Sequence, residues 1–227
     1  MKRLIDIVLS GVFLVLVSPF LVFAFVGIKL TSPGPVFYTA QRVGKGGAPF
    51  SMYKFRTMNV APKDDAGAVI TSFGDPRIFK FGALLRKTKI DELPQFLNVL
   101  NGDMSVVGPR PEDPKIVTDH YTDWMMETLD VRPGLTSPGA VFYYACGEEL
   151  IDTADPEGSY VEKLLPLKLA IERGYLARDT VLRDFAVMVR TALAIVREAI
   201  GRPLRANADD IAAASDWVDP AAFEAFK

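Results

Sequence analysis

Residues 7–28 read IVLSGVFLVLVSPFLVFAFVGI, a run of 22 residues without a charged side chain. As a straight helix this run would be roughly 33 Å long, because an α-helix rises about 1.5 Å per residue. The hydrocarbon core of a bilayer is about 30 Å thick. A cleaved signal peptide fits less well, since the run is too long and no small-x-small cleavage site follows it. The sequence therefore predicts a membrane anchor within residues 1–30.

Two features of this anchor bear on whether it crosses the bilayer. Pro19 follows Ser18 near the middle of the run, and proline removes a backbone donor and kinks a helix. The Ser18 hydroxyl can bond to a carbonyl group that such a kink leaves free. Positive charge lies on both flanks, at Lys2, Arg3 and Lys29, so the positive-inside tendency favours neither orientation. The residues leave two forms open: a re-entrant helix that returns to the face it entered, and a kinked single span.

The chain of 227 residues has room for this anchor and one further domain. We expect that domain at residues 31–200, with residues 201–227 as a peripheral helix or tail. Cys146 is the only cysteine and His120 the only histidine, which excludes an internal disulfide and zinc sites built from His and Cys. Any bound metal would need oxygen ligands, which is typical of Mg²⁺.

Charge is distributed unevenly about the net value of −2. Residues 41–110 hold 11 Lys and Arg against 6 Asp and Glu, a balance of +5. Residues 111–227 hold 12 against 21, a balance of −9. A basic region of this kind favours an anionic substrate or an anionic membrane surface. A solvated mosaic of charges is the alternative explanation.

Beyond the anchor, the sequence predicts an α+β domain that is predominantly helical. The breaker cluster TSPGP at residues 31–35 is expected to end the membrane helix. Alternating apolar residues indicate strands, and longer apolar periodicity indicates helices. The predicted elements are strands at 36–38 and 50–56, a glycine turn at 44–47, a polar loop at 61–73, and helices at 79–86, 92–100 and 161–199 with a break at Gly174.

The last part of this helical region carries a basic stripe. Arg183, Arg190 and Arg197 are seven residues apart within residues 181–200, which are otherwise mostly apolar. Such a helix could lie on a membrane surface. A helix that packs on the core with one solvated edge explains the same pattern. The first interpretation would add an interfacial amphipathic helix to the anchor.

The sequence KIDELP at residues 89–94 places two adjacent carboxylates before a proline. Aspartate is a good helix N-cap and proline is tolerated in the first helical turn, so a structural cap is the simplest explanation. Arg86, Lys87 and Lys89 supply more positive charge than a cap requires. A helix N-terminus also stabilises anions. Asp91 and Glu92 are therefore candidates for a phosphate-handling site.

Arg110 lies between Pro109 and Pro111, and the two prolines hold the segment extended. A guanidinium group fixed in this way suits bidentate binding of phosphate. One carboxylate of the pair can then act as a nucleophile, and the other can hold Mg²⁺ against a diphosphate. Such a nucleophile needs no histidine as base, since a carboxylate is ordinarily ionised at neutral pH. The residues predict phosphoryl transfer.

At this point the chain resembles the bacterial sugar transferases, or monotopic phosphoglycosyl transferases, in their short form. The resemblance covers roughly residues 1–200 and rests on many motifs in family order, which makes it far more specific than any one of them. The motifs are KRLID at 2–6, SP at 18–19, SPGPV at 32–36, YKFRTM at 53–58, LRKT at 85–88, DELPQ at 91–95, NVLNGDMS at 98–105, VGPRP at 107–111 and VRPG at 131–134.

The resemblance implies transfer of a sugar 1-phosphate from a UDP-sugar to polyprenyl (undecaprenyl) phosphate, with release of UMP, as the first step of a glycoconjugate such as an exopolysaccharide. It favours a re-entrant anchor broken at Ser18-Pro19, with a compact cytosolic domain on the cytoplasmic face of the bacterial inner membrane. The expected partners are the UDP-sugar, the polyprenyl phosphate, the phospholipid membrane and downstream glycosyltransferases, with a homodimer left open and no nucleic acid.

The resemblance also implies roles for single residues. By position in the motifs, Asp91 is the expected nucleophile that becomes phosphoglycosylated, and Glu92 together with Asp91 is the expected Mg²⁺ site. Arg86 and Arg110 are expected to bind phosphate. The other candidates for substrate contacts are Lys54 and Arg56, which match a basic motif, and Asp184, which aligns with a late family aspartate of supporting role.

Two departures from the family pattern concern the sugar end of the substrate. Residues 135–140 read LTSPGA, where the family usually continues with Thr-Gly and a run of small residues and Gln. Arg178 stands where an Asn is common. The sequence therefore does not predict which sugar is carried. Two other functions also fit a membrane-anchored chain with this basic segment: an adaptor that presents a lipid- or nucleotide-binding surface, and a hydrolase that passes the intermediate to water.

Overall fold

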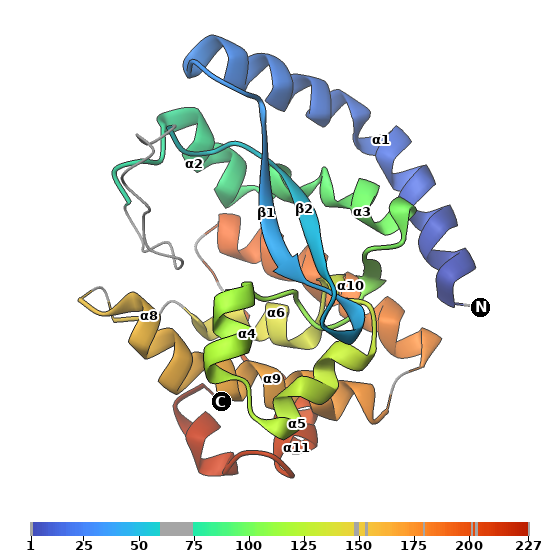
Figure 1. The fold of residues 1–227 in the computed structure, drawn as a ribbon, viewed down its shortest axis with the longest axis vertical. Coiled ribbons are helices and arrows are strands. Elements are labelled where there is room, and N and C mark those ends of the chain that lie inside the picture. The colour runs from blue at the N-terminus through green and yellow to red at the C-terminus, as the bar shows by residue number, and fades with distance from the viewer. Residues whose placement is uncertain are drawn as a thin grey trace.

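The computed structural model describes residues 2–59, 75–147, 150–152, 154–178, 180–200, 202 and 204–226. Helix α1 (Lys2–Thr31) lies along one edge of the molecule, and α11 (Ala208–Ala214) lies at the opposite end near the C-terminus (Figure 1). A β-hairpin and a set of shorter helices fill the space between them. The loop predicted at 61–73 lies outside the described residues.

Helix α1 is continuous, with Pro19 inside it, and bends around the rest of the molecule (Figure 1). The Ser18 hydroxyl donates to the backbone carbonyl of Val15 at 2.8 Å. In a regular helix that carbonyl would accept from the amide of residue 19, which proline lacks. The predicted break at Ser18-Pro19 is therefore wrong for the secondary structure, because the hydroxyl takes the place of the missing donor and the helix continues.

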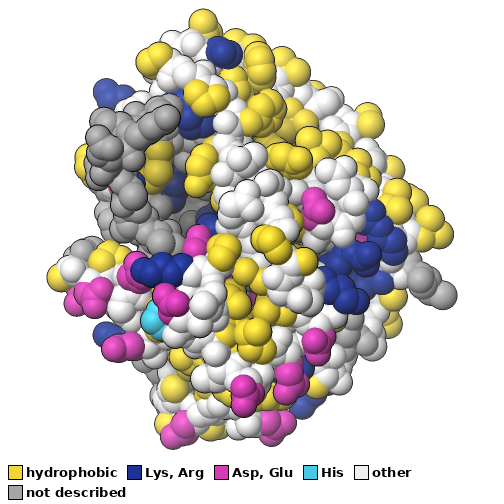
Figure 2. Space-filling view, viewed as in Figure 1, with side chains coloured by type: hydrophobic (Ala, Val, Ile, Leu, Met, Phe, Trp, Pro, Cys, Tyr) yellow, Lys and Arg dark blue, Asp and Glu magenta, His cyan; other side chains and the backbone are white. Residues whose placement is uncertain are grey.

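Among the described residues, α1 is the one helix that is long and apolar enough to cross a membrane. Only 11% of its most apolar window is buried inside the protein. Figure 2 shows its apolar side chains along the outer edge of the molecule. The exposed ones include Leu4, Val8, Val12, Val15, Leu16, Phe20, Val22, Phe23, Val26 and Leu30. The predicted apolar anchor is confirmed as a helix, and its re-entrant course stays a prediction.

The chain then forms an antiparallel hairpin from β1 (Phe37–Val43) and β2 (Pro49–Phe55). Phe37 pairs with Phe55, and the connection is the short 3₁₀ turn Lys45–Gly47, where Gly46 and Gly47 have positive φ angles of 67° and 81°. The two strands and the glycine turn are confirmed, although the first strand extends further than expected.

Two short helices follow, α2 (Lys80–Lys87) and α3 (Gln95–Asn101), with a 3₁₀ turn at Ile90–Glu92 between them. Lys89, just before this turn, is left-handed with φ 56° and redirects the chain. Both predicted helices are present, but α3 begins only after Pro94. Asp91 therefore does not cap a helix, and the predicted N-cap is wrong.

A short parallel pair, β3 (Ser105–Val107) and β4 (Gly134–Thr136), positions the proline segment that carries Arg110. The Gly108 amide donates to the Thr136 carbonyl at 3.0 Å, and the Gly134 amide donates to the Pro109 carbonyl at 2.8 Å. A Cβ atom on Gly134 would lie 2.2 Å from the backbone nitrogen of Gly108. Glycine at position 134 is thus required for the close approach that fixes this segment.

The remaining helices surround α9, which is buried along most of its length. Gly174 lies inside α9, where the lack of a side chain lets α11 approach closely. A Cβ atom there would lie 2.4 Å from the Ala213 carbonyl oxygen of α11. The predicted break in the 161–199 region is present, but it lies after Leu176, where α9 ends before α10 begins at Val181, and not at Gly174. The elements are α4 (Pro114–His120), α5 (Asp123–Met126), α6 (Pro138–Phe142), α8 (Pro156–Ser159), α9 (Leu165–Leu176) and α10 (Val181–Ala199), with 3₁₀ turns at Glu127–Asp130 and Pro220–Phe226 and π-helical turns at Tyr143–Gly147 and Tyr160–Leu164.

Three apolar clusters hold these elements together. The largest surrounds α9 and includes Phe142, Ile211 and Phe223, so the C-terminal segment packs into the core and is not the peripheral helix or tail that was expected. A second joins the hairpin to α3 and α10, and a third lies between α1 and α2. The site described next lies where the hairpin, the turn before α3 and the proline segment meet.

Candidate active site

Asp91 and Glu92 lie side by side in the 3₁₀ turn but have different surroundings. Glu92 Oε1 accepts from Lys54 Nζ of β2 at 3.0 Å and from Arg110 Nη2 at 2.5 Å. Asp91 is 7% exposed, and its Oδ1 atom is buried without a hydrogen-bond partner among the described residues. Glu92 is therefore held by two cations, whereas Asp91 keeps a buried oxygen that can still accept a hydrogen bond or bind a ligand.

The surroundings also separate the pKa values of the two carboxyl groups. Burial raises the pKa of Asp91 to about 6, and the charge of Glu92 adds to this increase against the opposing effects of Lys54, Arg86 and Lys89. Burial alone would raise the pKa of Glu92 too, but Arg110 and Lys54 outweigh it and hold that pKa well below its usual range. Glu92 is thus ionised throughout the physiological pH range. Asp91 is mostly ionised at pH 7, because its pKa of about 6 lies one unit below that pH.

Arg110 completes this cluster from the proline segment. Its Nη2 atom pairs with Glu92, and its Nη1 atom is buried without a partner among the described residues. Buried polar atoms are nearly always hydrogen-bonded in native proteins. The unpaired guanidinium nitrogen of Arg110 and the unpaired carboxylate oxygen of Asp91 belong to one cluster that is joined through Glu92, as expected of a site that accepts an anionic, oxygen-rich group.

Lys89 adds a further cation next to an aromatic ring. Its Nζ atom lies 4.1 Å from the centre of the Tyr144 ring, which belongs to the π-helical turn at Tyr143–Gly147. A cation over an aromatic face at this distance is attractive. Because Tyr144 also influences the pKa of Arg110, the ring borders the same cluster.

Behind the proline segment lies a second buried polar cluster, formed by Glu112, Tyr160 and Lys168. Glu112 Oε1 accepts from the Tyr160 hydroxyl at 2.6 Å and from Lys168 Nζ, and Lys168 Nζ also donates to the Tyr160 hydroxyl at 2.6 Å. Lys168 is 3% exposed and Glu112 is 8% exposed. Since Glu112 follows Pro111 directly, this cluster fixes one end of the segment that carries Arg110.

The departure from the family pattern at residues 135–140 packs against the same helix, α9. The Ser137 hydroxyl accepts from the Ala140 amide at 2.9 Å, which caps α6, and donates to Glu172 Oε1 at 2.5 Å. A Cβ atom on Gly139 would lie 2.5 Å from Glu172 Oε1, so the backbone of α6 packs closely against the Glu172 side chain. Burial raises the pKa of Glu172 to about 8. These residues form a tight junction behind the site.

The structure brings most of the predicted site residues together. Lys54, Asp91, Glu92 and Arg110 form the cluster, and Arg86 is close enough to lower the pKa of Asp91. The buried residues Pro109 and Pro111 flank Arg110, as expected of a rigid support. The geometry of this group agrees with the expected phosphate chemistry, while the individual roles of its members stay predictions.

Arg56 has different neighbours. Its guanidinium donates to the Pro35 carbonyl at 2.5 Å, to the Ser32 hydroxyl at 2.7 Å and to the Met58 carbonyl at 3.2 Å. It also lies 5.4 Å from the centre of the Phe79 ring. Arg56 thus fastens the chain after α1 to the end of β2, and a substrate contact by Arg56 stays a prediction.

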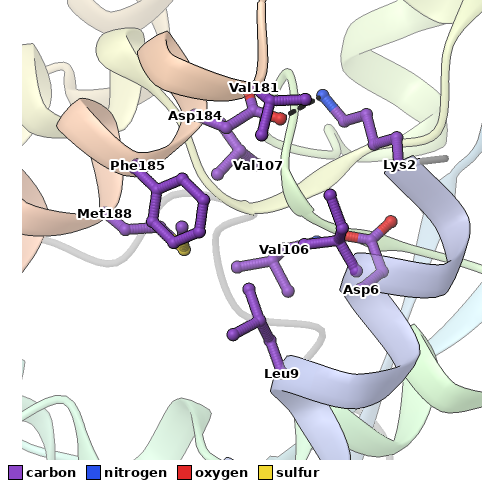
Figure 3. Close-up of a pocket in the computed structure, with 10 residues that line it drawn as sticks. Lys2, Asp6, Leu9, Val106, Val107, Val181, Asp184, Phe185 and Met188 are labelled. Carbon is purple, nitrogen blue, oxygen red and sulfur yellow. Dashed lines mark hydrogen bonds and ion pairs between the residues drawn. The ribbon is translucent and has the colours of Figure 1, made fainter.

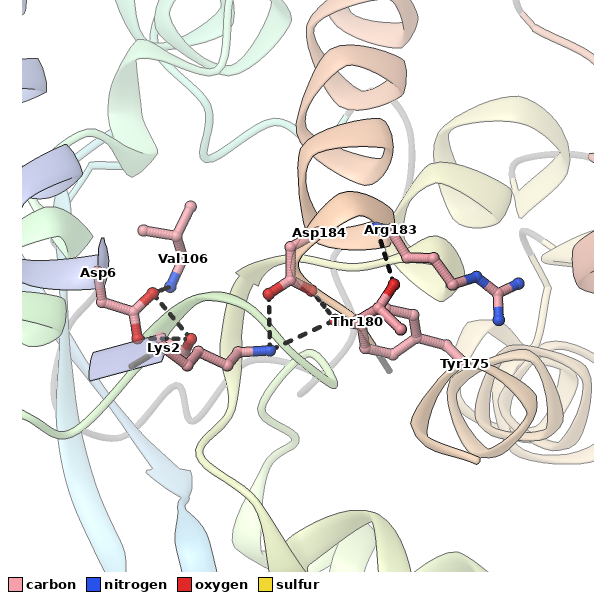
Figure 4. A network of polar contacts seen from close by, with 8 residues as sticks. Lys2, Asp6, Val106, Tyr175, Thr180, Arg183 and Asp184 are labelled. Atoms are coloured by element: carbon pink, nitrogen blue, oxygen red, sulfur yellow. Dashed lines mark hydrogen bonds and ion pairs between the residues drawn. The ribbon is translucent and has the colours of Figure 1, made fainter. Parts of the chain in front are cut away.

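Asp184 lies at the junction of α1 and α10. It forms an ion pair with Lys2 at 3.0 Å and accepts from the Tyr175 hydroxyl (Figure 4). Asp6, one turn along α1, accepts from Ser105 Oγ at 2.8 Å and from the Val106 amide at 3.0 Å. Figure 3 shows Lys2, Asp6 and Asp184 among the side chains that line a cavity of about 10 Å³. The contacts of Asp184 tie the start of α1 to the catalytic domain, which fits a supporting role.

One residue of the DELPQ motif received no role from the sequence. Gln95 is completely buried, and both polar atoms of its side chain lack partners among the described residues. Gln95 follows Asp91 by four residues in a region that was predicted to begin a helix. In a helix, that spacing would place both side chains on the same side, so the sequence held a signal for Gln95.

Comparison with known proteins supports the same interpretation. The family model described as "Bacterial sugar transferase" matches residues 1–198. A UDP-glucose:undecaprenyl-phosphate glucose-1-phosphate transferase of Caulobacter vibrioides is 36% identical over 193 residues, 84% of this chain and 67% of that protein. The corresponding Escherichia coli transferase is 49% identical over 142 residues, 60% of this chain and 30% of that protein.

A third relative, from Bacillus subtilis, is named a putative undecaprenyl-phosphate N-acetylgalactosaminyl 1-phosphate transferase. It is 48% identical over 113 residues, 50% of this chain and 63% of that protein. The chain thus matches between about a third and two thirds of the length of these relatives. With the motif series, the apolar helix and the family match over residues 1–198, the chain belongs to the bacterial sugar transferase family.

Proposed function

We propose that this protein transfers a sugar 1-phosphate from a UDP-sugar to undecaprenyl phosphate through a covalent phosphosugar intermediate on Asp91. The observation that carries the proposal is the buried, unpaired Oδ1 atom of Asp91 in a cluster that also holds the unpaired Nη1 atom of Arg110. Relatives whose names describe this reaction on undecaprenyl phosphate support the substrate class.

In the first step, an ionised oxygen of Asp91 attacks the phosphorus that bears the sugar. A new O–P bond forms, the bond from that phosphorus to the bridging oxygen breaks, and UMP leaves with the electron pair. In the second step, a phosphate oxygen of undecaprenyl phosphate attacks the same phosphorus. The Asp91 O–P bond breaks, the carboxylate is restored, and a diphosphate-linked sugar lipid is released.

The neighbouring residues act by holding charge in fixed places. Arg110 Nη1 is available to donate to an oxygen of the transferring phosphoryl group, which stabilises the charge that develops there. Glu92 holds Arg110 and Lys54 in position through its Oε1 atom. Because the guanidinium and the carboxylate are preorganised, little reorganisation is needed when the substrate binds.

The residues also fit Mg²⁺ as an expected cofactor. Magnesium is commonly bound by one or two carboxylates together with substrate phosphates, and Asp91 provides a buried oxygen without a protein partner. Among the described residues there is no cluster of three or more His, Cys, Asp or Glu that could hold a metal by itself. Asp91 and Glu92 would hold the ion together with the diphosphate, and the ion would offset the negative charge of that diphosphate.

The membrane course that we propose uses two apolar surfaces. Besides α1, the helix α10 exposes apolar side chains at every third or fourth position, and Arg190 at the margin of this face pairs with Asp210 at 2.6 Å. The exposed apolar residues are Val181, Leu182, Phe185, Val189, Leu193 and Val196 of α10, and Ile200 directly after it. Such a face fits a helix lying in the membrane interface.

We infer that α1 is re-entrant and that the catalytic domain lies on the cytoplasmic face of the inner membrane. Labelling of both ends of α1 by an impermeant reagent, in inverted vesicles but not in intact cells, would support this course. Labelling of one end from outside the cell would show a single span instead.

The catalytic proposal is tested by measuring UMP release over a panel of UDP-sugars with and without undecaprenyl phosphate. Asp91→Asn should abolish release, while Asp103→Asn should be milder, because Asp103 accepts only a structural bond from Asn98 at 3.1 Å. Full activity in Asp91→Asn would rule out Asp91 as the nucleophile. Continuous turnover without the lipid acceptor would favour a hydrolase, and no turnover with any UDP-sugar would favour an adaptor.

A further inference from the structure

Gln95, the first residue of α3, has a buried side chain amide with no bonding partner. It is 0% exposed, and neither its Oε1 nor its Nε2 atom has a hydrogen-bond partner among the described residues. Burying an amide without a compensating hydrogen bond is unfavourable for folding. A buried, unpaired amide at this position therefore indicates a role other than stabilising the fold.

Asn98, one turn further along the same helix, provides a matched contrast. It is also 0% exposed, but its Oδ1 atom accepts from the Tyr53 amide at 2.9 Å. Its Nδ2 atom donates to the Ser51 carbonyl at 2.8 Å and to Asp103 at 3.1 Å. Asn98 therefore fastens α3 to β2, whereas Gln95 makes no such structural bond.

The position of Gln95 on α3 indicates where its amide points. Phe96 faces α1, since its ring lies 4.6 Å from that of Phe13. Asn98 faces β2, and Val99 lies in the core cluster shared with the hairpin. Gln95 precedes Asn98 by three residues and Val99 by four, so it shares their inward side rather than that of Phe96.

Asp91 lies one turn before Gln95, in the 3₁₀ turn at Ile90–Glu92. This turn and α3 both pack against β2. Lys54 of β2 donates to Glu92, and the neighbouring Tyr53 amide donates to Asn98 on the inward side of α3. The unpaired amide of Gln95 and the unpaired carboxylate oxygen of Asp91 therefore belong to two consecutive segments that meet at the same stretch of β2.

We propose that Gln95 binds the phosphosugar group that is transferred to Asp91. The Nε2 atom would donate to an oxygen of that phosphoryl group, and the Oε1 atom would accept from a hydroxyl of the attached sugar. A neutral amide suits this place, because Glu92 and Asp91 already supply negative charge and Arg110 and Lys54 supply positive charge. The inference rests on the proposed function and adds a substrate-binding residue to it.

The test compares Gln95→Met with Asn98→Leu. Methionine nearly conserves the volume of glutamine and has no polar group that needs a partner. We expect Gln95→Met to keep or raise Tm while the rate of UMP release falls about 100-fold, the size typical of losing one donor to a developing charge. Asn98→Leu should instead lower Tm, because it leaves the Tyr53 amide and the Ser51 carbonyl without their partner.

Two further measurements separate this inference from the proposed function. Gln95→Leu should likewise lose activity with an intact fold, because it removes both polar atoms without burying a charge. The rise in Tm that a UDP-sugar produces in the wild-type protein should shrink in Gln95→Met, and this readout does not require turnover. Wild-type turnover and an unchanged UDP-sugar shift in Gln95→Met would overturn the inference, as would parallel losses of Tm and activity. A wild-type protein that binds but never releases UMP would overturn the proposed function alone.

Discussion

The two buried charged clusters of this protein are similar in composition but differ in how completely they are bonded. In the cluster behind the site, Glu112 is held by Tyr160 and Lys168, and none of these three side chains has a buried unpaired polar atom in the part of the chain that the structure describes. In the cluster around Asp91, two buried polar atoms are unpaired. Burial and charge alone do not distinguish these two clusters, whereas their unpaired bonding capacity does.

The two clusters are also mechanically connected. Arg110 belongs to the open cluster, and Glu112, two residues later, belongs to the closed one. The backbone amide of Val43 donates to the Glu112 carbonyl at 3.0 Å, so the end of strand β1 is also bonded to the segment that joins the two clusters. We therefore expect changes in the closed cluster to act on stability and changes in the open cluster to act on turnover.

The largest expected effect on stability follows from Lys168→Met. Removing the ammonium leaves Glu112 buried without its cation, and breaking a buried pair on one side typically costs about 3–5 kcal/mol. Thermal unfolding of the protein in detergent should show a clear fall in Tm. The control is Lys115→Met, which removes a surface ion pair with Glu157 and should leave Tm unchanged. An unchanged Tm in Lys168→Met would mean that the closed cluster does not support the fold.

The open cluster should respond in the opposite way to Arg110→Lys. Lysine can keep a charge pair with Glu92 but cannot present a second nitrogen to the phosphoryl group. Tm should change little, while the rate of UMP release falls by about 10²–10³-fold, as for the loss of a preorganised donor. Arg42→Lys, in the ion pair with Asp113, is the control and should leave the rate intact. A normal rate in Arg110→Lys would show that Nη1 does not contact substrate.

The contrast between the clusters also shows which structural features can be predicted from sequence patterns. The apolar run of α1, the hairpin and the Asp91-Glu92 site were predictable because each is encoded within a few consecutive residues. The bond from Lys168 to Glu112 joins residues 56 apart, and no local pattern indicates it. Gly174 has the composition of a helix break, but its role is close packing against α11, which only the folded structure reveals.

Lys54 and Arg56 illustrate the same limit at shorter range. Two residues apart on a strand, they would be expected to share one face and hence one function. The strand β2 ends at Phe55, so Arg56 turns toward the end of α1 while Lys54 reaches Glu92. Similarly, Asp91 was expected to cap α3, but the left-handed Lys89 places it in a separate turn. In both cases the exact end of an element decided the role of a side chain.

The pH dependence of the first step gives the smallest expected effect and sharpens the difference between the two carboxylates. Attack requires ionised Asp91, whose pKa is raised to about 6, mainly by burial and then by Glu92. The value of kcat/KM for the UDP-sugar should therefore be level above pH 7 and fall about tenfold per pH unit well below pH 6, because protonation removes the nucleophile.

Glu92→Gln tests the cause of this raised pKa. Removing the negative charge beside Asp91 should lower its pKa, so the acid limb of the profile should move to lower pH even if the overall rate decreases. Initial rates of UMP release between pH 5 and pH 8 in both proteins would measure the shift. If the acid limb of the profile stays in place, the titrating group is not Asp91. If the acid limb moves to higher pH, the loss of ordered Lys54 and Arg110 raises the pKa of Asp91 by more than the removal of the Glu92 charge lowers it. Only the downward shift is consistent with Glu92 as a fixed anion that tunes its neighbour.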